Sequence, residues 1–121
     1  MVKKRKNNHA VIIISTFPDE DSAFSVAKKL VTRKLCACVS LTKIRSVYSW
    51  KGKLEDQPEF MALFKTTKQS SKKLQLAIAD LHPYQVPEII ELKLTEVSKS
   101  YLSWLIKESA DGIAKKRNYA A

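Results

Sequence analysis

Two long β-type segments that meet at one tight turn are the feature of this sequence that most constrains its fold. Residues 36–51 show a period of two, Lys51-Gly52 is a turn signal, and residues 53–66 return as the partner strand. A hairpin of this length overhangs a sheet whose other strands are of ordinary size. Overhanging edges are a liability in a monomer, so we expect subunits to associate through them, with help from the aromatic residues Tyr48 and Trp50.

The side-chain pattern of the first of these strands changes partway along. Its apolar residues share one face as far as Leu41, and the later ones, from Ile44 to Trp50, have the opposite parity. A change of parity within one strand predicts a bulge or bend near residues 42–43. In the returning strand, Pro58 cannot donate a backbone hydrogen bond, so it indicates an edge or an irregularity.

The rest of the chain supplies helices and further strands. Thr16 is a candidate helix cap, and Pro18 suits the first helical turn that follows it. The order β-α-β-β-α-β is the split βαβ plan of an α+β domain, with both main helices on one face of an antiparallel sheet. The predicted elements outside the hairpin are a strand over 9–16, a helix from Pro18 to about Val31, a helix over 67–81, a strand over 88–95 and a short helix over 98–108.

Length and charge bound the organisation of the chain. At 121 residues, one domain is the default. The net charge is +10, of which residues 3–6 carry +4 and residues 115–117 carry +3, so +3 is left for the remainder. We therefore predict a basic disordered tail over 1–8, a domain over 9–112 and a second basic tail over 113–121. Terminal basic runs are usually solvated, so we expect only weak contact with nucleic acid.

Several functional classes are excluded by what the sequence lacks. No apolar run reaches the roughly 18 residues that cross a bilayer, and no signal-peptide pattern follows the basic N-terminus. Cys36 and Cys38 are the only cysteines, too few for a disulfide framework, and these features together predict a cytoplasmic protein. The chain also has no glycine-rich phosphate loop, metal-binding His-Glu-x-x-His helix or Cys-x-x-Cys pair, so we predict that it is not an enzyme.

Three residues are candidate metal ligands. Cys36 and Cys38 lie two apart on a predicted strand, so both thiols would share one face, with Cα atoms about 6.5–7 Å apart, at the limit for a disulfide. Such a pair could hold Cu(I). The alternative, which the residue type favours, is that both are small buried core residues. His82 ends a helix before a rigid two-proline loop, where it could bind a metal or complement the helix dipole.

Five blocks of the sequence resemble the CutA divalent-cation tolerance family, in the family's order and over about residues 10–108. The resemblance implies a ferredoxin-like fold with an extra C-terminal helix, and a homotrimer in which long strands pair across subunits. The matching blocks are Leu30-Val31 with Leu35-Cys36-Ala37-Cys38-Val39, Ser46-Val47-Tyr48-Ser49-Trp50-Lys51-Gly52, Glu59 with Phe64-Lys65-Thr66, His82-Pro83-Tyr84-Gln85-Val86-Pro87-Glu88-Ile89, and Tyr101-Leu102-Ser103-Trp104-Leu105.

The resemblance also implies a site. The family is linked to tolerance of copper and other divalent metals without an established reaction, so no cofactor is required, and copper or another divalent metal is the implied ligand. A polar pocket between subunits is implied, lined by Trp50, Glu59, Lys65, Tyr84 and Glu88. Because buried charges need partners, a structural network that joins Lys65 to Glu59 or Glu88 is an equal alternative.

The copper site of the family is incomplete in this sequence. Ligands of some bacterial members fall at positions that are Ser15 and Leu81 here, and neither is a soft metal ligand. The usual family residue at the position of Cys36 is alanine. The resemblance therefore makes Cys38 the stronger candidate ligand and Cys36 the weaker, and a site built from both thiols would be peculiar to this chain.

These observations lead to one prediction of function and two alternatives. We predict a trimeric, non-enzymatic, cytoplasmic protein that acts in divalent-metal (copper) tolerance as a binding or regulatory module. The first alternative is a trimeric signalling protein that binds a small anionic metabolite between subunits. The second is a protein-interaction scaffold that uses the basic tails.

Overall fold

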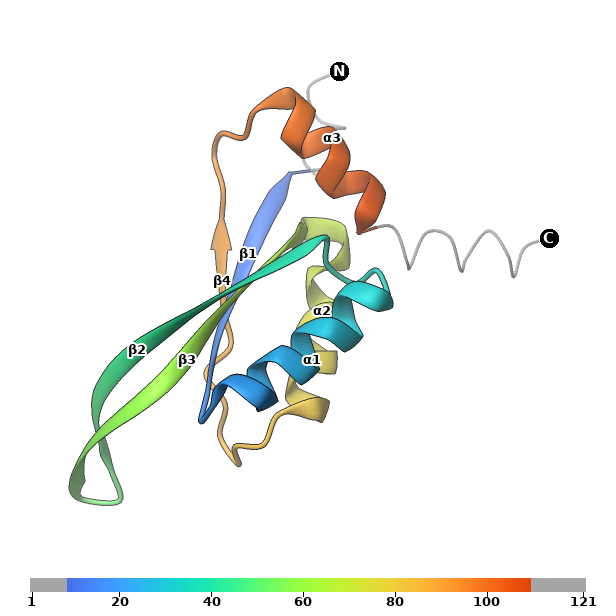
Figure 1. The fold of residues 1–121 in the computed structure, drawn as a ribbon. Coiled ribbons are helices and arrows are strands. Elements are labelled where there is room, and N and C mark those ends of the chain that lie inside the picture. Colours follow the sequence, from blue (N-terminus) through green and yellow to red (C-terminus); the bar gives the residue numbers. More distant parts are fainter. Residues whose placement is uncertain (1–8, 110–121) are drawn as a thin grey trace.

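The structure, a computed structural model, describes residues 9–109 (Figure 1). The predicted tails, 1–8 and 113–121, and the last residues of the predicted domain lie outside the described residues. Within the described part, no helix combines the length and apolar composition needed to cross a membrane. The elements in chain order are β1 (Ala10–Phe17), α1 (Glu20–Thr32), β2 (Cys38–Trp50), β3 (Lys53–Thr67), α2 (Lys68–Leu81), β4 (Ile90–Lys93) and α3 (Lys99–Glu108).

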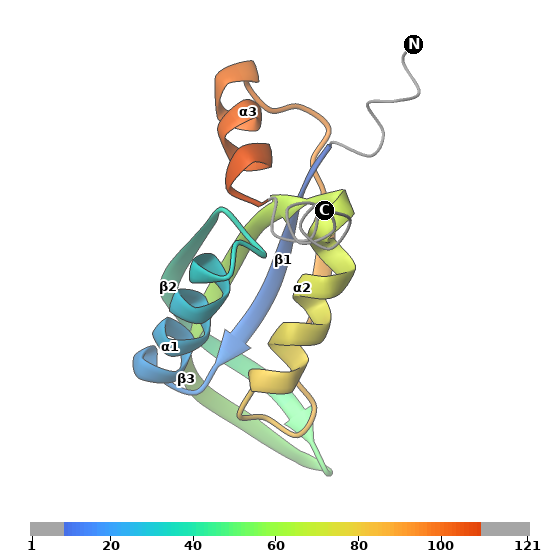
Figure 2. The same cartoon turned by 90° about the vertical axis from the view of Figure 1, so that its right-hand side faces the viewer.

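The strands form one antiparallel sheet, in the order β2-β3-β1-β4. Helices α1 and α2 lie side by side on one face of this sheet, and α3 lies at the end of the sheet where β1 begins (Figures 1 and 2). The predicted α+β fold, a ferredoxin-like β-α-β-β-α-β sandwich with an additional C-terminal helix, is confirmed. We call the sheet face that α1 and α2 leave uncovered the open face.

Alternation along β1 decides which side chains reach the core. Val11, Ile13 and Phe17 are fully buried and pack against α1 and α2, together with Phe64 of β3 and Leu74 of α2. The intervening side chains of β1 therefore point to the open face, because neighbouring residues of a strand point to opposite sides. A smaller apolar cluster, Ala10 with Ala37 and Leu105, holds α3 against the end of the sheet.

The β2–β3 hairpin extends well beyond the rest of the sheet, as the sequence predicts (Figure 1). Its strands pair without interruption from Cys38 opposite Lys65 to Trp50 opposite Lys53, whereas β1 stops at the pair Phe17–Phe60. Pro58 lies past this pair, where β1 no longer pairs with β3 and one edge of β3 is free. No strand of the chain needs a hydrogen bond from residue 58 at that edge, so the lack of an N–H costs nothing there, and the edge prediction is confirmed.

The turn that closes the hairpin requires two left-handed residues. Lys51 has φ 51° and Gly52 has φ 80°. Two consecutive positive φ values match a type I′ turn, whose twist agrees with that of the strands it joins. Glycine adopts this backbone conformation without the steric penalty that other residues meet.

The predicted bulge in β2 is wrong. The register with β3 is unbroken through residues 42–43, so the strand keeps its pleat. What changes is the surroundings. Val39 and Leu41 pack against the core under the helices, but beyond β1 no helix covers that face, and Tyr48 and Trp50 on the other face border a cavity instead. The parity of the apolar residues therefore changes because the packing partner moves to the other face.

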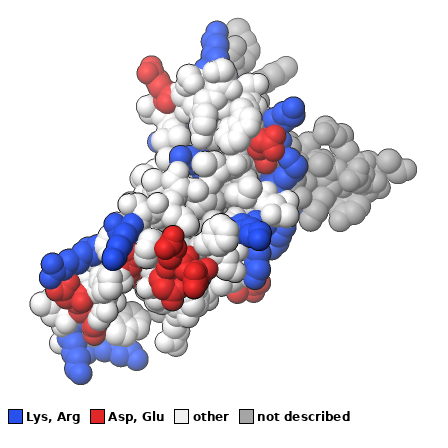
Figure 3. Space-filling view, viewed as in Figure 1, with Lys and Arg blue, Asp and Glu red and all other residues white. Residues whose placement is uncertain are grey.

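Two element boundaries also differ from the prediction. Thr16 stays in β1, and Asp19 caps α1 by accepting a hydrogen bond from the N–H of Ser22 at 2.8 Å. Asp19 and the acidic residues of the first turn lie at the positive end of the helix dipole. In Figure 3 acidic side chains gather near the start of α1, with basic side chains on both sides. The second difference is β4, which is shorter than predicted because it pairs only with residues 11–14 of β1.

Two leucines of α2 test this arrangement of the core. Leu74 is fully buried, whereas Leu76, two residues further along, is 65% exposed. We expect Leu74→Ala to lower the free energy of unfolding by about 2–5 kcal/mol, because it removes buried methyl groups and leaves a cavity. The matched change Leu76→Ala should alter it by no more than about 0.5 kcal/mol. Guanidinium denaturation followed by circular dichroism measures both, and equal effects would contradict the assignment of the helix faces.

Candidate functional site

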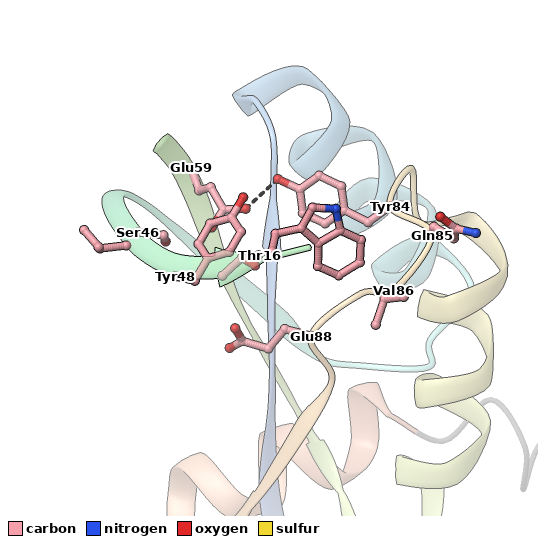
Figure 4. Close-up of a pocket in the computed structure, with 10 residues that line it drawn as sticks. Thr16, Ser46, Tyr48, Glu59, Tyr84, Gln85, Val86 and Glu88 are labelled. Atoms are coloured by element: carbon pink, nitrogen blue, oxygen red, sulfur yellow. Dashed lines mark hydrogen bonds between the residues drawn. The ribbon is translucent and has the colours of Figure 1, made fainter. Parts of the chain in front are cut away.

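A cavity lies where the overhanging hairpin approaches the loop after α2 (Figure 4). Its volume is about 590 Å³. Three segments supply its walls: the end of β1, the far half of the hairpin, and the loop between α2 and β4. We call it the hairpin pocket. The lining residues are Thr16, Ser46, Val47, Tyr48, Trp50, Glu59, Tyr84, Gln85, Val86 and Glu88.

Glu59 and Tyr84 form the polar centre of the hairpin pocket. The Tyr84 hydroxyl donates a short hydrogen bond to Oε2 of Glu59, drawn as a dashed line in Figure 4. Glu59 is only 6% exposed although it is a carboxylate. Burial, together with the bond to Glu59, raises the pKa of Tyr84 well above its ordinary value. Tyr84 therefore stays protonated at neutral pH and remains the donor of this pair.

His82 connects the pocket loop to the core. Its ring stacks on Phe17 with centroids 4.3 Å apart, its Nδ1 accepts a hydrogen bond from the Tyr84 N–H at 3.1 Å, and its Nε2 lies 3.0 Å from the Ser15 hydroxyl. Burial lowers the pKa of His82, which favours the neutral ring. With Nδ1 accepting, the proton of a neutral ring is on Nε2, which then donates to Ser15. Both nitrogens are thus engaged, and a metal ion at either one would displace an existing hydrogen bond.

The two cysteines occupy different environments. Cys36 precedes β2, which begins at Cys38, so the prediction that both lie on one strand is wrong. Cys36 is fully buried in the core, and burial, with a smaller effect from Cys38, raises the pKa of its thiol to about 12. A thiol of this kind is a poor source of the thiolate that binds metals. Cys38 is half-buried and points to the open face, because its neighbour Val39 packs into the core.

Cys38 and His82 do not meet within one chain. Cys38 stands opposite Lys65, in the row of Ile12, whereas His82 contacts Ser15, three residues further along β1. This places them about 10 Å apart along the strands and about two strand spacings apart across the sheet. They also lie on opposite faces. Among residues 9–109, no group of three or more His, Cys, Asp and Glu side chains is arranged to hold a metal ion.

Four of the five predicted pocket residues surround the hairpin pocket, and Lys65 does not. Lys65 donates to the hydroxyl of Ser40 at 2.9 Å and lies six residues from Glu59 on the same face of β3, a distance of about 20 Å. The alternative network that joins Lys65 to Glu59 or Glu88 is therefore not formed within one chain. The predicted position of the pocket between subunits stays a prediction.

The structure adds pocket residues that sequence reasoning missed. Tyr48 has the same parity in β2 as Trp50, so the strand pattern alone could have placed both on one wall. Thr16 and Val86 offered no such signal. Thr16 was interpreted as a helix cap, but it stays in β1 and reaches the hairpin pocket from the open face, and Val86 reaches it from the loop after α2.

Comparison with known proteins places this geometry in a family. A family model described as CutA1 divalent ion tolerance protein matches residues 11–108. The divalent-cation tolerance protein CutA of Thermotoga maritima is 40% identical over 95 residues, which cover 78% of this chain and 94% of that protein. CutA of Pyrococcus horikoshii is 41% identical over 99 residues, which cover 82% of this chain and 97% of that protein.

Solved structures of CutA proteins share the fold. The crystal structure of CutA1 from Pyrococcus horikoshii has a TM-score of 0.80 at 40% identity and covers 82% of this chain and 97% of its own. CutA from Synechococcus elongatus has a TM-score of 0.82 at 32% identity, with 84% and 91% covered. A protein described as the periplasmic divalent cation tolerance protein CutA, from Archaeoglobus fulgidus, has a TM-score of 0.80 at 29% identity, with 83% and 98% covered. The match to the family model, to these sequences and to these structures shows that the chain belongs to the CutA1 divalent ion tolerance family.

Proposed function

We propose that this chain is a non-enzymatic binding or regulatory module in divalent-cation tolerance, that it handles copper, and that it acts as a homotrimer in the cytoplasm. The observation that carries the proposal is the family match over residues 11–108, which spans nearly all of the described domain. The cytoplasmic location is supported by two unpaired cysteines, since thiols persist in reducing compartments.

Support for self-association comes from two surfaces of the single chain. The first is the free backbone edge of the hairpin beyond Phe60, which a second strand could pair with. The second is the open face, where Ile90 and Leu92 of β4 are 45% and 46% exposed and Ile12 and Ile14 of β1 are half-buried beside them. Contiguous apolar surface of this kind is unusual on a monomer and typical of an interface.

Sedimentation of matched variants tests the trimer. We expect the full chain to sediment with the mass of three copies, and Leu92→Lys to shift it towards smaller species, because a charge would replace an apolar side chain at the interface. The control is Leu76→Lys, which places the same charge on the outer side of α2, where Leu76 is 65% exposed, and should leave the mass unchanged. A wild-type monomer at micromolar concentration, or equal behaviour of the two variants, would contradict the assembly.

For copper, Cys38 is the ligand that the geometry favours. It is half-buried on the open face, where a neighbouring chain would pack, whereas Cys36 is enclosed in the core with its thiol protonated. Since one described chain holds no group of three ligands, a copper site would combine Cys38 with residues from another subunit. Soft thiolate ligands suit Cu(I).

A Cu(I) titration of the reduced full chain tests this assignment. We expect stoichiometric binding. Substituting a residue that only supports a metal ligand typically weakens metal affinity by roughly 10–100-fold, and Cys38→Ser, which removes a ligand itself, should weaken it by more. Cys36→Ala and His82→Ala should bind as the unchanged chain does, because Cys36 lies in the core and both nitrogens of His82 are engaged. Binding that survives Cys38→Ser, or that His82→Ala abolishes, would contradict the role given to Cys38.

The two alternative functions gain no support from the described residues. A pocket for an anionic metabolite needs positive charge, but the hairpin pocket is lined by two carboxylates and by no lysine or arginine of the described chain, and Gln85 is a neutral donor. The scaffold alternative depends on the basic tails, which lie outside the described residues.

A further inference from the structure

We propose that the hairpin pocket binds the primary ammonium group of a small organic amine. The ammonium group would lie against Glu59, and the short apolar part of the amine would lie against the aromatic side chains of the walls and Val86. This ligand site is distinct from the copper site proposed at Cys38, which faces the other end of the sheet.

Glu59 has one carboxylate oxygen that no group of the described chain engages. Glu59 is 94% buried, by its 6% exposure, and lines the cavity, yet the hydrogen bonds of residues 9–109 engage only its Oε2, through Tyr84. Its second oxygen, Oε1, has no hydrogen-bond partner in the described part of the chain and is not one of the fully enclosed atoms, so it is open to the cavity. A buried carboxylate is costly unless it is paired and hydrogen-bonded. A primary ammonium group supplies both the opposite charge and N–H donors.

Three aromatic side chains line the hairpin pocket, those of Tyr48, Trp50 and Tyr84. The faces of such rings carry partial negative charge and attract cations, most strongly for tryptophan. Trp50 already does so within the chain, because the Lys51 ammonium lies 5.8 Å from its ring centroid. An aromatic wall beside a carboxylate is a setting for an organic cation.

Further negative charge lies at or near the hairpin pocket. Glu88 is a second lining carboxylate, and Asp19 lies near enough to act electrostatically on Tyr84. Figure 4 shows Glu88 and Glu59 on different sides of the cavity, so their carboxylates do not converge on one point. Two separated carboxylates suit a cation of extended shape better than a bare divalent ion, which takes several oxygen ligands at once.

The size and the apolar surface of the hairpin pocket suit a small organic ligand. A volume of about 590 Å³ is in the usual range of small-molecule pockets. Val86, which is 66% exposed, supplies apolar surface at the rim. A short alkyl chain on the ammonium group would cover this surface, whereas an inorganic cation would leave it in water.

The test uses the full chain with three probes of the same length: n-butylammonium, n-butanol and butyrate. Binding is measured by calorimetry and by the fluorescence of Trp50 in a Trp104→Phe background, since the chain has only these two tryptophans. We expect saturable binding of n-butylammonium and binding about tenfold or more weaker for the other two probes. n-Butanol keeps a donor for Glu59 but loses the positive charge, and butyrate loses the donor and is repelled by the carboxylate.

Matched variants identify the residue responsible. Glu59→Gln should weaken n-butylammonium binding about tenfold or more, whereas Glu96→Gln, an exposed glutamate outside the pocket, should not change it. Trp50→Leu at a 42% exposed position should also weaken binding, and it keeps the test open if Glu59→Gln fails to fold. Circular dichroism and sedimentation verify that each variant is folded and assembled.

Three results would overturn the proposal. The first is no binding of n-butylammonium, and the second is binding that Glu59→Gln leaves unchanged. The third is binding that occurs only after Lys65→Met, which would mean that the lysine of a second copy, and not a free amine, supplies the ammonium group. None of these results depends on copper binding, so the proposal can fail while the metal function stands, and the reverse also holds.

Discussion

The difference in length between β1 and the β2–β3 hairpin is the constraint on which the rest of this structure depends. β1 has 8 residues, whereas β2 and β3 have 13 and 15. Up to the pair Phe17–Phe60 the hairpin is part of a covered sheet, and beyond it the strands pair only with each other. The same few residues thus end the core, open a cavity and leave backbone edges free. The position of the candidate site and the free edges proposed for assembly both follow from where β1 stops.

A chain of contacts joins the core to the pocket across this boundary. Phe17, the last residue of β1, stacks on His82, whose Nδ1 accepts from the backbone of Tyr84, whose hydroxyl donates to Glu59 on the hairpin. Each link fixes the position of the next, so the start of the loop is held between the core and the hairpin although it has no regular secondary structure. In this role His82 serves the loop, and its neutral ring is the form that both of its hydrogen bonds require.

The sequence was informative where local chemistry decides the structure and misleading where a distant partner decides it. The turn at Lys51-Gly52, the long hairpin and the buried stripe of α2 follow from residue type and spacing alone. The bulge was predicted from the change of parity in β2. The parity changes because the first half of β2 packs under the helices and the second half borders the hairpin pocket on the other face, which the sequence of one strand cannot show. Lys65 matched a family pattern, yet it lies six residues from Glu59 on the same strand, a separation that the sequence spacing already implied once both were placed on β3. Cys36 was predicted to lie in the strand because the alternating side-chain pattern begins at residue 36, two residues before β2 starts.

One wall of the hairpin pocket stands on the part of the hairpin that no other strand of the chain supports. In a trimer held through this hairpin, the occupancy of the pocket and the association of the subunits would share one structural element. Thermodynamic reciprocity then applies: a ligand that prefers the supported hairpin tightens subunit association by the same factor by which association tightens the ligand. The strength of subunit association would thus depend on whether the hairpin pocket is occupied, without the movement of a domain.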